Sequence, residues 1–401
     1  MSTPPITRIL FVDDEPLVLE VLKLTLEFAE GEWEAMVAHS GEEALALITK
    51  QRFDIVISDM RMSGMTGAQL LNEVMKRSPT TIRIILSGYA DEDEIFHCVG
   101  ATHQFLGKPF ELSALAATLK RINGLKARLR SPEIQKLLTR KEALPSIPDV
   151  YFKILEAIQA PSNPTQQIAE IVASDPALTA RMLQLVNSAF FGFAREVSGV
   201  DEAVMLLGVG TIRSLVLAMH LFSAFNMPPS GNSPLHQVWS HSGRVAQLAR
   251  KIVSLEGGDA KLQEQAFTAG LLHDIGKLIL ADNLSAKYLE ILAQARQARR
   301  PLVEVERQEL QATHAELGGF LLDLWGLPAP LVEAVALHHE PACADPVAFG
   351  PLTAVHAANV LEWELSGSAG DPAAPQLDLE YLRRLNLEDR VEFWRSKLAD
   401  L

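Results

Sequence analysis

The first 110 or so residues alternate short apolar runs with stretches of helical periodicity. Five runs, rich in branched residues, indicate strands that are buried on both faces: Arg8–Val12, Trp33–Ala38, Asp54–Ser58, Ile82–Leu86 and Gln104–Gly107. Apolar residues between them recur at helical spacing, beginning with the helix that Pro16 opens. Strands that alternate with helices in this way predict an α/β doubly wound domain with a five-stranded parallel sheet.

Beyond residue 144 the apolar positions follow only a helical period. Segments of this kind are Val150–Ile158, Thr165–Ser174, Asp175–Val186, Val200–Leu207 and Thr211–Phe225. The loop Asn226–Pro234, rich in Pro, Gly and Asn, precedes a second helical block. The pattern therefore predicts an all-α second domain.

These patterns suggest four parts. We expect a first domain over 1–124, a basic helical linker over 125–141, a second domain over 142–364, and a flexible break with a C-terminal helical tail over 365–401. The second domain divides into an N-terminal helical bundle over 142–234 and a further part over 235–364. We interpret the basic linker as a solvated helix, although a nucleic-acid or partner patch is the alternative.

Composition narrows the classes of function. The chain has 401 residues and a net charge of −14, which argues against an electrostatic nucleic-acid binder. Its two cysteines, Cys98 and Cys343, form no CxxC pair and fit a reducing compartment. The N-terminus shows no signal peptide, and runs such as Leu215–Phe225 are too short to span a bilayer. We therefore expect a cytoplasmic protein with no membrane partner.

Polar residues stand where the predicted strands end: Asp13 and Asp14 after the first, Asp59 after the third, Ser87 after the fourth and Lys108 after the fifth. The carboxyl ends of parallel strands share one edge of a sheet, so these side chains should gather there. Three carboxylates together favour Mg²⁺, which binds carboxylates, water and phosphate oxygens. A hydroxyl and an ammonium group suit a phosphoryl group that a carboxylate nucleophile has accepted.

Residues 6 to about 123 resemble a response-regulator receiver domain. The resemblance rests on VDDE at 12–15, DMRMSGMTG at 59–67, LSG at 86–88 and KPF at 108–110. It implies a sheet with strand order 2-1-3-4-5 and phosphorylation by a sensor histidine kinase. The family usually has Pro where this chain has Ser63, a loop substitution that we expect to matter little.

The resemblance also implies a role for each residue of the motifs. Asp59 is the phosphoacceptor, Asp13 and Asp14 hold Mg²⁺ with it, and the carbonyl of Arg61 completes the metal shell. Lys108 contacts the phosphoryl group, Ser87 and Phe105 form the switch pair, and the bond before Pro109 is cis.

Histidines of the second domain stand on helix faces that are otherwise apolar. His241 shares a face with Val245 and Ile252, and His314 aligns with Leu317 and Leu321. The remaining members of this set are His273, Asp274, His338 and His339. Imidazoles and a carboxylate are ligands for Fe, Mn or Zn, so the set is a candidate metal site.

The order of these residues resembles the HD superfamily of metal-dependent phosphohydrolases, and HDIGK and HHE are shared with its cyclic-dinucleotide phosphodiesterases. The chain departs from that pattern because the GYP loop is missing, Asn359 stands at the position of a metal-binding Asp, and Gln237 at that of a Glu. Loss of two carboxylates should weaken the binding of two adjacent cations.

Longer phrases, at 144–150, 171–192 and 201–217, resemble the HDOD output domain, a relative of HD proteins. This resemblance covers roughly Glu142 to Glu364 and implies a module that acts mainly through protein contacts. Expected partners are the histidine kinase, an unidentified downstream protein and, as one option, a second copy of the chain. A phosphohydrolase, with Fe, Mn or Zn, is the alternative, and a DNA-binding output is disfavoured because no Arg- and Lys-rich recognition helix follows residue 150.

Overall fold

The computed structural model describes most of the chain. It covers residues 6–28, 33–78, 81–87, 102–108, 115–116, 118–120, 129, 134, 137, 149–159, 163–186, 197–224, 234–344, 348–368 and 371–399. The chain forms two compact units, and the main division between them falls between Ile147 and Pro148. Most of the expected linker, the predicted cis bond before Pro109 and the loop at 226–233 lie outside the described residues.

The first unit is built on one parallel sheet. Its strands are β1 (Thr7–Val12), β2 (Trp33–Ala38), β3 (Ile55–Asp59), β4 (Ile82–Ser87) and β5 (Gln104–Gly107). They lie in the order β2-β1-β3-β4-β5, which confirms the predicted fold class and strand order. β1 and β3 are central and covered on both faces, which is why their sequences are continuous apolar runs.

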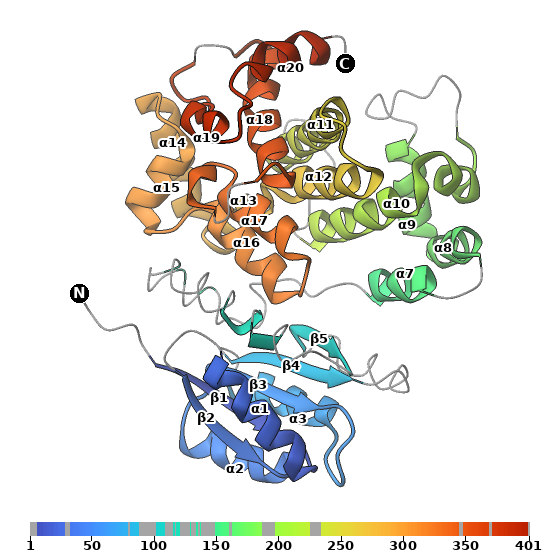
Figure 1. Ribbon diagram of the computed structural model, residues 1–401, viewed down its shortest axis with the longest axis vertical. Coiled ribbons are helices and arrows are strands. Elements are labelled where there is room, and N and C mark those ends of the chain that lie inside the picture. The colour runs from blue at the N-terminus through green and yellow to red at the C-terminus, as the bar shows by residue number, and fades with distance from the viewer. Residues whose placement is uncertain are drawn as a thin grey trace. The chain divides into compact units, whose positions relative to one another are not determined.

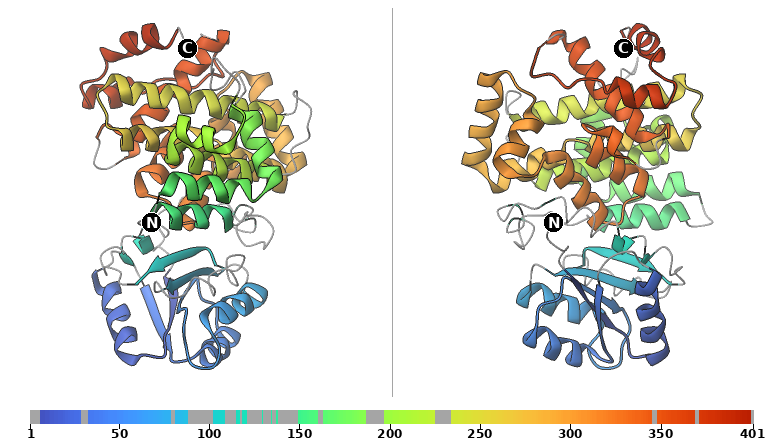
Figure 2. Two further views of the ribbon diagram at one scale, coloured as in Figure 1. Left: turned by 90° about the vertical axis from the view of Figure 1, so that its right-hand side faces the viewer. Right: turned by 60° about the vertical axis from the view of Figure 1, so that its left-hand side comes forward.

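Helices lie on both faces of this sheet. Figure 2 shows α1 (Pro16–Phe28) on one face, with α2 (Gly41–Lys50) and α3 (Gly67–Arg77) on the other. Ser40 caps α2 by accepting a hydrogen bond from the Glu43 N–H, and Thr66 forms a capping box with Gln69 at the start of α3. These caps fix where both helices begin beside the carboxyl ends of the strands.

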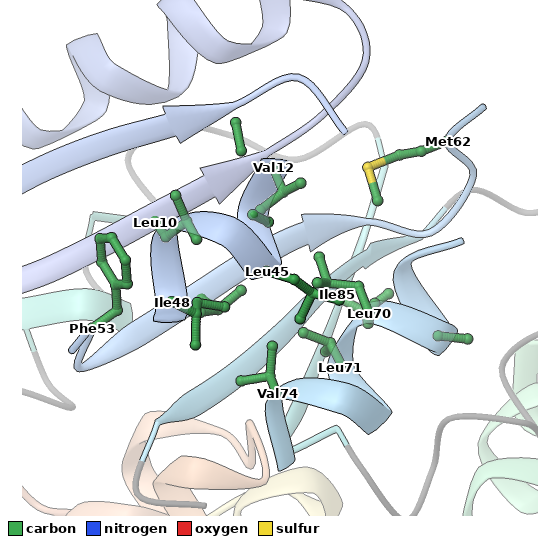
Figure 3. Packing of buried hydrophobic residues seen from close by; sticks show 14 of the residues in the cluster. Leu10, Val12, Leu45, Ile48, Phe53, Met62, Leu70, Leu71, Val74 and Ile85 are labelled. Carbon is green, nitrogen blue, oxygen red and sulfur yellow. The ribbon is translucent and has the colours of Figure 1, made fainter. Parts of the chain in front are cut away.

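Apolar side chains of the sheet, α2 and α3 form the core of the first unit (Figure 3). Leu10 from β1, Ile85 from β4, and Leu70 and Leu71 from α3 are fully buried. Complete burial of such a side chain contributes about 1.5–3 kcal/mol. The core therefore holds the strand ends, and the polar residues that follow them, in fixed positions.

The described part of the second unit is entirely helical, as predicted (Figure 1). Its first helices are α7 (Asp149–Gln159), α8 (Pro164–Ala173), α9 (Pro176–Val186) and α10 (Val200–Ala224). The second block contains α11 (Pro234–Leu255), α12 (Ala260–Leu272), α13 (Ile275–Asn283), α14 (Ser285–Ala298), α15 (Leu302–Leu310), α16 (His314–Leu324), α17 (Ala329–Leu337) and α18 (Pro351–Trp363). Among them α11, α12, α17 and α18 pack together, and His241, His273 and His338 lie on these helices or directly after them.

Helix α10 is long and apolar, but it is not continuous. Gly208 has φ 77° and ψ 157°, so the helix bends there, at the break that the sequence pattern predicted between Leu207 and Thr211. Within the described residues, Val200–Leu221 is the one helical stretch long and apolar enough to cross a membrane, a length that the sequence pattern did not indicate. About 56% of its most apolar window is buried inside the protein.

The C-terminal residues pack against the second block. A π-helical turn, Glu364–Ser368, follows α18, and two short helices close the chain, α19 (Leu379–Arg384) and α20 (Arg390–Leu398). Trp394 is fully buried, and its indole N–H donates to Glu256, which directly follows α11, at 2.8 Å. The tail is therefore part of the folded unit.

Candidate functional site

Three side chains of the first unit meet at the carboxyl edge of the sheet. Asp13 follows β1, Asp59 ends β3 and Lys108 follows β5. The Lys108 ammonium lies 2.5 Å from Asp59 Oδ1 and 3.4 Å from Asp13 Oδ2. The edge thus brings together the nearly buried carboxylate of Asp13, the partly exposed carboxylate of Asp59 and the ammonium group of Lys108, as the sequence predicted.

Asp14 is directed toward the loop after β3. Its Oδ2 accepts hydrogen bonds from the Ser63 N–H at 2.9 Å and from the Ser63 hydroxyl at 3.0 Å. The backbone bond is the main cause of a lowered pKa of Asp14. Proline at position 63 could donate neither bond, so this contact is one that the motif alone did not predict.

Gly67 explains the last residue of the motif that follows Asp59. A Cβ atom at this position would lie 2.0 Å from the carbonyl oxygen of Asp59, a distance that no side chain can occupy. The Gly67 N–H donates to the Met60 carbonyl at 2.9 Å and holds the start of α3 against the strand end. Glycine therefore allows α3 to approach the predicted phosphoacceptor.

Burial and charge act in opposite directions at this edge. Burial raises the pKa of Asp59, and the charge on Asp13 adds to this, while Lys108 opposes both. Burial disfavours the charged form of Lys108, but Asp59 and Asp13 outweigh it and raise the pKa of that ammonium. An additional cation between the carboxylates would relieve the repulsion between Asp13 and Asp59.

Two further predicted residues are placed only by their backbone. Ser87 ends β4 and Phe105 lies in β5, where Phe105 pairs with Ile85. Their side chains lie outside the described part of the chain, so the proposed switch pair stays a prediction. The same holds for a metal contact by the carbonyl of Arg61.

The histidines singled out in the second domain converge on one point. They come from four elements: His241 from α11, His273 and Asp274 from the turn between α12 and α13, His314 from the start of α16, and His338 and His339 from the end of α17. Their possible ligand atoms form two groups, and within each group these atoms lie within 4.8 Å of one another. One group consists of His241, His273 and Asp274, and the other of His314, His338 and His339. Sequence segments up to 98 residues apart thus build one cluster, as predicted.

Asp274 lies between the two groups. Its Oδ2 is 3.4 Å from His273 Nε2 and 3.8 Å from His241 Nε2, whereas its Oδ1 is 3.2 Å from His314 Nε2 and 3.9 Å from His338 Nε2. The Lys277 ammonium also reaches Asp274 Oδ2 at 2.6 Å. One carboxylate therefore faces imidazole nitrogens with both of its oxygens.

Gly276, in the HDIGK motif, permits this convergence. A Cβ atom there would lie 1.9 Å from the carbonyl oxygen of His314. The backbones of α13 and α16 can therefore approach closely only because residue 276 has no side chain.

Two buried carboxylates that sequence reasoning missed orient the outer histidines. Glu306 of α15 is completely buried and accepts from His314 Nδ1 at 2.6 Å and from the Tyr288 hydroxyl at 2.7 Å. Glu362 of α18 accepts from His241 Nδ1 at 2.7 Å and from Arg244 at 2.6 Å. Each directs the opposite ring nitrogen toward Asp274. The sequence signal that could have identified Glu306 and Glu362 was a Glu on a helix face that is otherwise apolar.

Backbone carbonyls orient the two innermost histidines. His273 Nδ1 donates to the Gly270 carbonyl at 2.7 Å, and His338 Nδ1 donates to the Val335 carbonyl at 2.8 Å. The opposite nitrogens, together with Asp274 Oδ1, are buried without a hydrogen-bond partner. Buried polar atoms without partners are rare, and a bound cation would satisfy all three. The donor set of imidazoles and carboxylate fits Fe, Mn or Zn.

Burial keeps most of these imidazoles neutral. It lowers the pKa of His273 to about 4 and lowers that of His338 and His339 well below the ordinary value. Burial would raise the pKa of Asp274, but the surrounding His273, Lys277 and His314 hold it well below its usual range. Neutral imidazoles around an ionised carboxylate are the protonation states that metal binding requires.

Asn359, the residue in place of the expected Asp, lies beside the cluster. Its side-chain oxygen is 3.0 Å from His241 Nε2, and the residue is buried. Gln237 is exposed at the pocket that contains the cluster. This pocket has a volume of about 1030 Å³, and Asp274, His314 and His338 lie at its buried end.

Comparisons with known proteins match both units. The family model of the response regulator receiver domain matches residues 9–120, and the family model of the HDOD domain matches residues 144–341. The transcriptional regulatory protein GlrR of Escherichia coli K12 is 40% identical over 119 residues, which are 29% of this chain and 26% of GlrR. The chain spans 26–42% of the lengths of the first curated relatives that it matches.

Two crystal structures resemble most of the chain. A Shewanella amazonensis protein assigned as a phosphohydrolase aligns with 68% of this chain and 95% of its own, at a TM-score of 0.51 and 25% identity. An HDOD domain protein of unknown function from Geobacter sulfurreducens aligns with 71% of this chain and 98% of its own, at a TM-score of 0.51 and 19% identity. The second likeness supports the fold alone. With both family models matched in order along the sequence, the chain is a two-component response regulator in which a receiver domain precedes an HDOD domain.

Proposed function

We propose that a sensor histidine kinase phosphorylates Asp59, and that this controls an HDOD domain acting mainly through contacts with a downstream protein. The observation that carries the first part is the ion pair of Asp59 with Lys108 beside buried Asp13. In the reaction, a carboxylate oxygen of Asp59 attacks phosphorus, the P–N bond to the kinase imidazole breaks, and an acyl phosphate forms. Lys108 would neutralise charge on the phosphoryl oxygens.

Asp13, Asp14 and Asp59 would hold Mg²⁺ at this edge. Their carboxylates are the ligands that Mg²⁺ prefers, and when bound the ion offsets negative charge on the transferred group. Ser63 would compete with the cation for Asp14, because it now donates two hydrogen bonds to that carboxylate. Ser87 and Phe105 remain the proposed switch pair, with residues 111–141 leading to the output domain, and we expect the protein in the cytoplasm.

Beryllofluoride, a mimic of the phosphoryl group, tests the switch. We expect it to change hydrogen exchange in the HDOD domain or the sedimentation coefficient of the full chain, and to change neither in Asp59→Asn. Unchanged exchange and sedimentation in the wild type, with beryllofluoride bound at Asp59, would refute the proposal.

A metal-dependent phosphohydrolase is the second candidate, because buried atoms of His273, Asp274 and His338 without partners converge beside a pocket that Asp274 and His338 line. His241, His273 and Asp274 could hold one cation, and His314, His338 and His339 a second, with Asp274 Oδ1 facing His314 and His338. A bound metal would supply a Lewis acid and an activated water. Asn359 and Gln237 weaken this reading, because neither supplies the negative charge that two adjacent cations need.

Elemental analysis and turnover separate the two roles of the cluster. A metal centre predicts stoichiometric Fe, Mn or Zn in the purified protein, lost in His273→Ala but retained in His39→Ala, which removes an exposed histidine of the receiver domain. An enzyme also predicts hydrolysis of a phosphodiester by the loaded protein. Metal without turnover supports the contact-based output, and no metal after loading with Mn²⁺ or Fe²⁺ removes both metal roles.

A further inference from the structure

The pocket beside the His and Asp cluster is unusually basic for this acidic chain. Its walls carry five cationic side chains, namely Arg244, Lys277, Arg296, Arg299 and Arg300, and three carboxylates, namely Asp274, Glu304 and Glu362. The protein as a whole has a net charge of −14. A local surplus of positive charge in such a chain attracts anions into the pocket.

The cations lie at two depths. Lys277 lies next to the buried cluster, where its ammonium contacts Asp274, and its side chain is 22% exposed. Arg296 and Arg299, at the end of α14, are exposed at the mouth of the pocket. Neither has an ion-pair partner among the described residues, whereas Arg300 is paired with Glu304 and Arg244 with Glu362. The two free guanidinium groups are thus available to a ligand.

The wall between these depths is apolar. Leu292 and Ala295 of α14 line it, together with Leu302 and Val303 of α15 and Trp363 of α18. Pro372, Ala373 and Pro375, from the segment before α19, add a further apolar side. A pocket of about 1030 Å³ with apolar walls and a few convergent charges has the size and character of small-molecule sites.

We propose that this pocket binds a small molecule that carries a phosphate group on an apolar or aromatic body. Arg296 and Arg299 would contact the phosphate at the mouth, and the body would lie against the apolar wall toward the cluster. Guanidinium groups bind phosphate through paired, charge-assisted hydrogen bonds, and the surplus of two positive charges matches a phosphate dianion. The HDOD domain would then respond to a ligand as well as to the receiver domain.

Two of the wall-forming elements, α18 and the segment before α19, lie beyond residue 341, where the match to the HDOD family ends. Trp363 closes α18, and the prolines follow the π-helical turn. The pocket is therefore completed by residues that the family pattern does not include.

Calorimetric titration of the full chain tests the site with naphthalen-1-ylmethylphosphonate, whose P–C bond resists hydrolysis. We expect it to bind at least tenfold more tightly than methylphosphonate, which lacks the apolar body, and than 1-naphthalenemethanol or 1-naphthylacetate, which lack the dianion. The double variant Arg296→Ala/Arg299→Ala should weaken binding at least tenfold. Arg52→Ala/Arg384→Ala, which removes the same charge from exposed sites elsewhere, should bind as the wild type does.

Equal binding by the wild type and the Arg296→Ala/Arg299→Ala variant would overturn the proposal, as would equal affinity for the phosphonate and 1-naphthylacetate. The titrations are run on metal-loaded and chelator-treated protein, and circular dichroism verifies that the variants are folded. The variants leave every His and Asp of the cluster in place. If the protein binds the phosphonate but takes up no metal on loading, only the metal centre is contradicted. If it takes up metal but does not bind the phosphonate, only this proposal is contradicted.

Discussion

At the scale of residues, the histidine cluster depends on groups that hold the histidines rather than on the histidines alone. Glu306 and Glu362 each bind the Nδ1 of one imidazole, and carbonyl oxygens bind those of His273 and His338. Fixing one nitrogen determines which atom of the ring is presented to the cluster. Metal affinity should therefore respond to residues that never contact the ion.

Glu306→Gln tests this dependence. The substitution keeps the size of a completely buried side chain but removes the charge that holds His314 and accepts from Tyr288. We expect metal affinity to fall about 10–100-fold, as measured by competition with a chelator. Glu290→Gln makes the same change on the exposed face of α14 and should have no effect. Equal affinities for the two variants would contradict a positioning role of Glu306.

The lowered pKa of His273 predicts a pH dependence of the metal-free protein. Between its unfolded pKa of about 6.5 and its folded pKa of about 4, only the unfolded chain binds the proton. The contribution of neutral His273 to the free energy of unfolding is therefore fully present above pH 6.5 and is lost as the pH falls toward 4. At pH 5 this residue should cost about 2 kcal/mol relative to pH 7.

Urea unfolding of the chelator-treated chain at pH 7 and pH 5 measures the effect. In His273→Gln the difference in unfolding free energy between the two pH values should shrink by about that amount. His338 and His339 have the same direction of shift and should preserve part of the difference. An unchanged difference in His273→Gln would argue against a neutral buried His273.

At the scale of elements, the cluster depends on how closely helices approach. The turn between α12 and α13 presents His273 and Asp274, and α16 presents His314 against it. Gly276 allows this approach, and Gly270 allows α12 to approach α11, since a Cβ at Gly270 would lie 2.7 Å from the backbone of Ala246. The helices contribute geometry that no single ligand residue encodes.

Gly276→Ala should separate α13 from α16. The added methyl group would meet the His314 carbonyl at 1.9 Å, and backbone cannot yield as a flexible side chain can. We expect a loss of about 1–3 kcal/mol in unfolding free energy and weaker metal binding, from urea unfolding and elemental analysis. Gly199→Ala is the control, because the added Cβ would have no atom within 4 Å apart from its neighbours along the chain. It should leave the unfolding free energy and the metal binding unchanged.

At the scale of the whole molecule, the chain combines two units with separate cores. The receiver core is formed by its sheet with α2 and α3, and the second unit packs its helices around α11, α12 and α18. The C-terminal tail belongs to the second unit, because Trp394 is buried and Arg395 pairs with Glu364. Stability of the output domain should therefore depend on residues well beyond the family match.

Trp394→Ala tests the contribution of the tail. Loss of a fully buried indole, and of its hydrogen bond to Glu256, should destabilise the second unit by about 3–5 kcal/mol. Hydrogen exchange should report the loss in α11 and leave protection of the receiver strands unchanged. Lys397→Ala, on the exposed face of α20, should be neutral. Reduced protection of β1 and β3 in Trp394→Ala would show that the two units do not unfold independently.

Much of this architecture was predictable from the sequence. The strands and helices of the receiver follow from period and strand-end chemistry, because burial on both faces requires continuous apolar runs and a shared edge collects polar residues. The helical second domain, the break in α10 near Gly208, the buried face of His314 and the largely buried face of His241 followed in the same way. These are local properties, and sequence spacing is sufficient to reveal them.

The tertiary structure decided what depends on distance between remote segments. Ser63 donates to Asp14 across 49 residues, Glu362 binds His241 across 121, and Asp274 separates two groups of histidines. The basic mouth of the pocket likewise combines the end of α14 with walls from α15, α18 and the tail. Sequence identifies side chains able to bind a metal or phosphate, whereas only the packing of helices sets which of them meet. The physical reason is that contact energies depend on separations of a few ångströms, which a one-dimensional pattern does not contain.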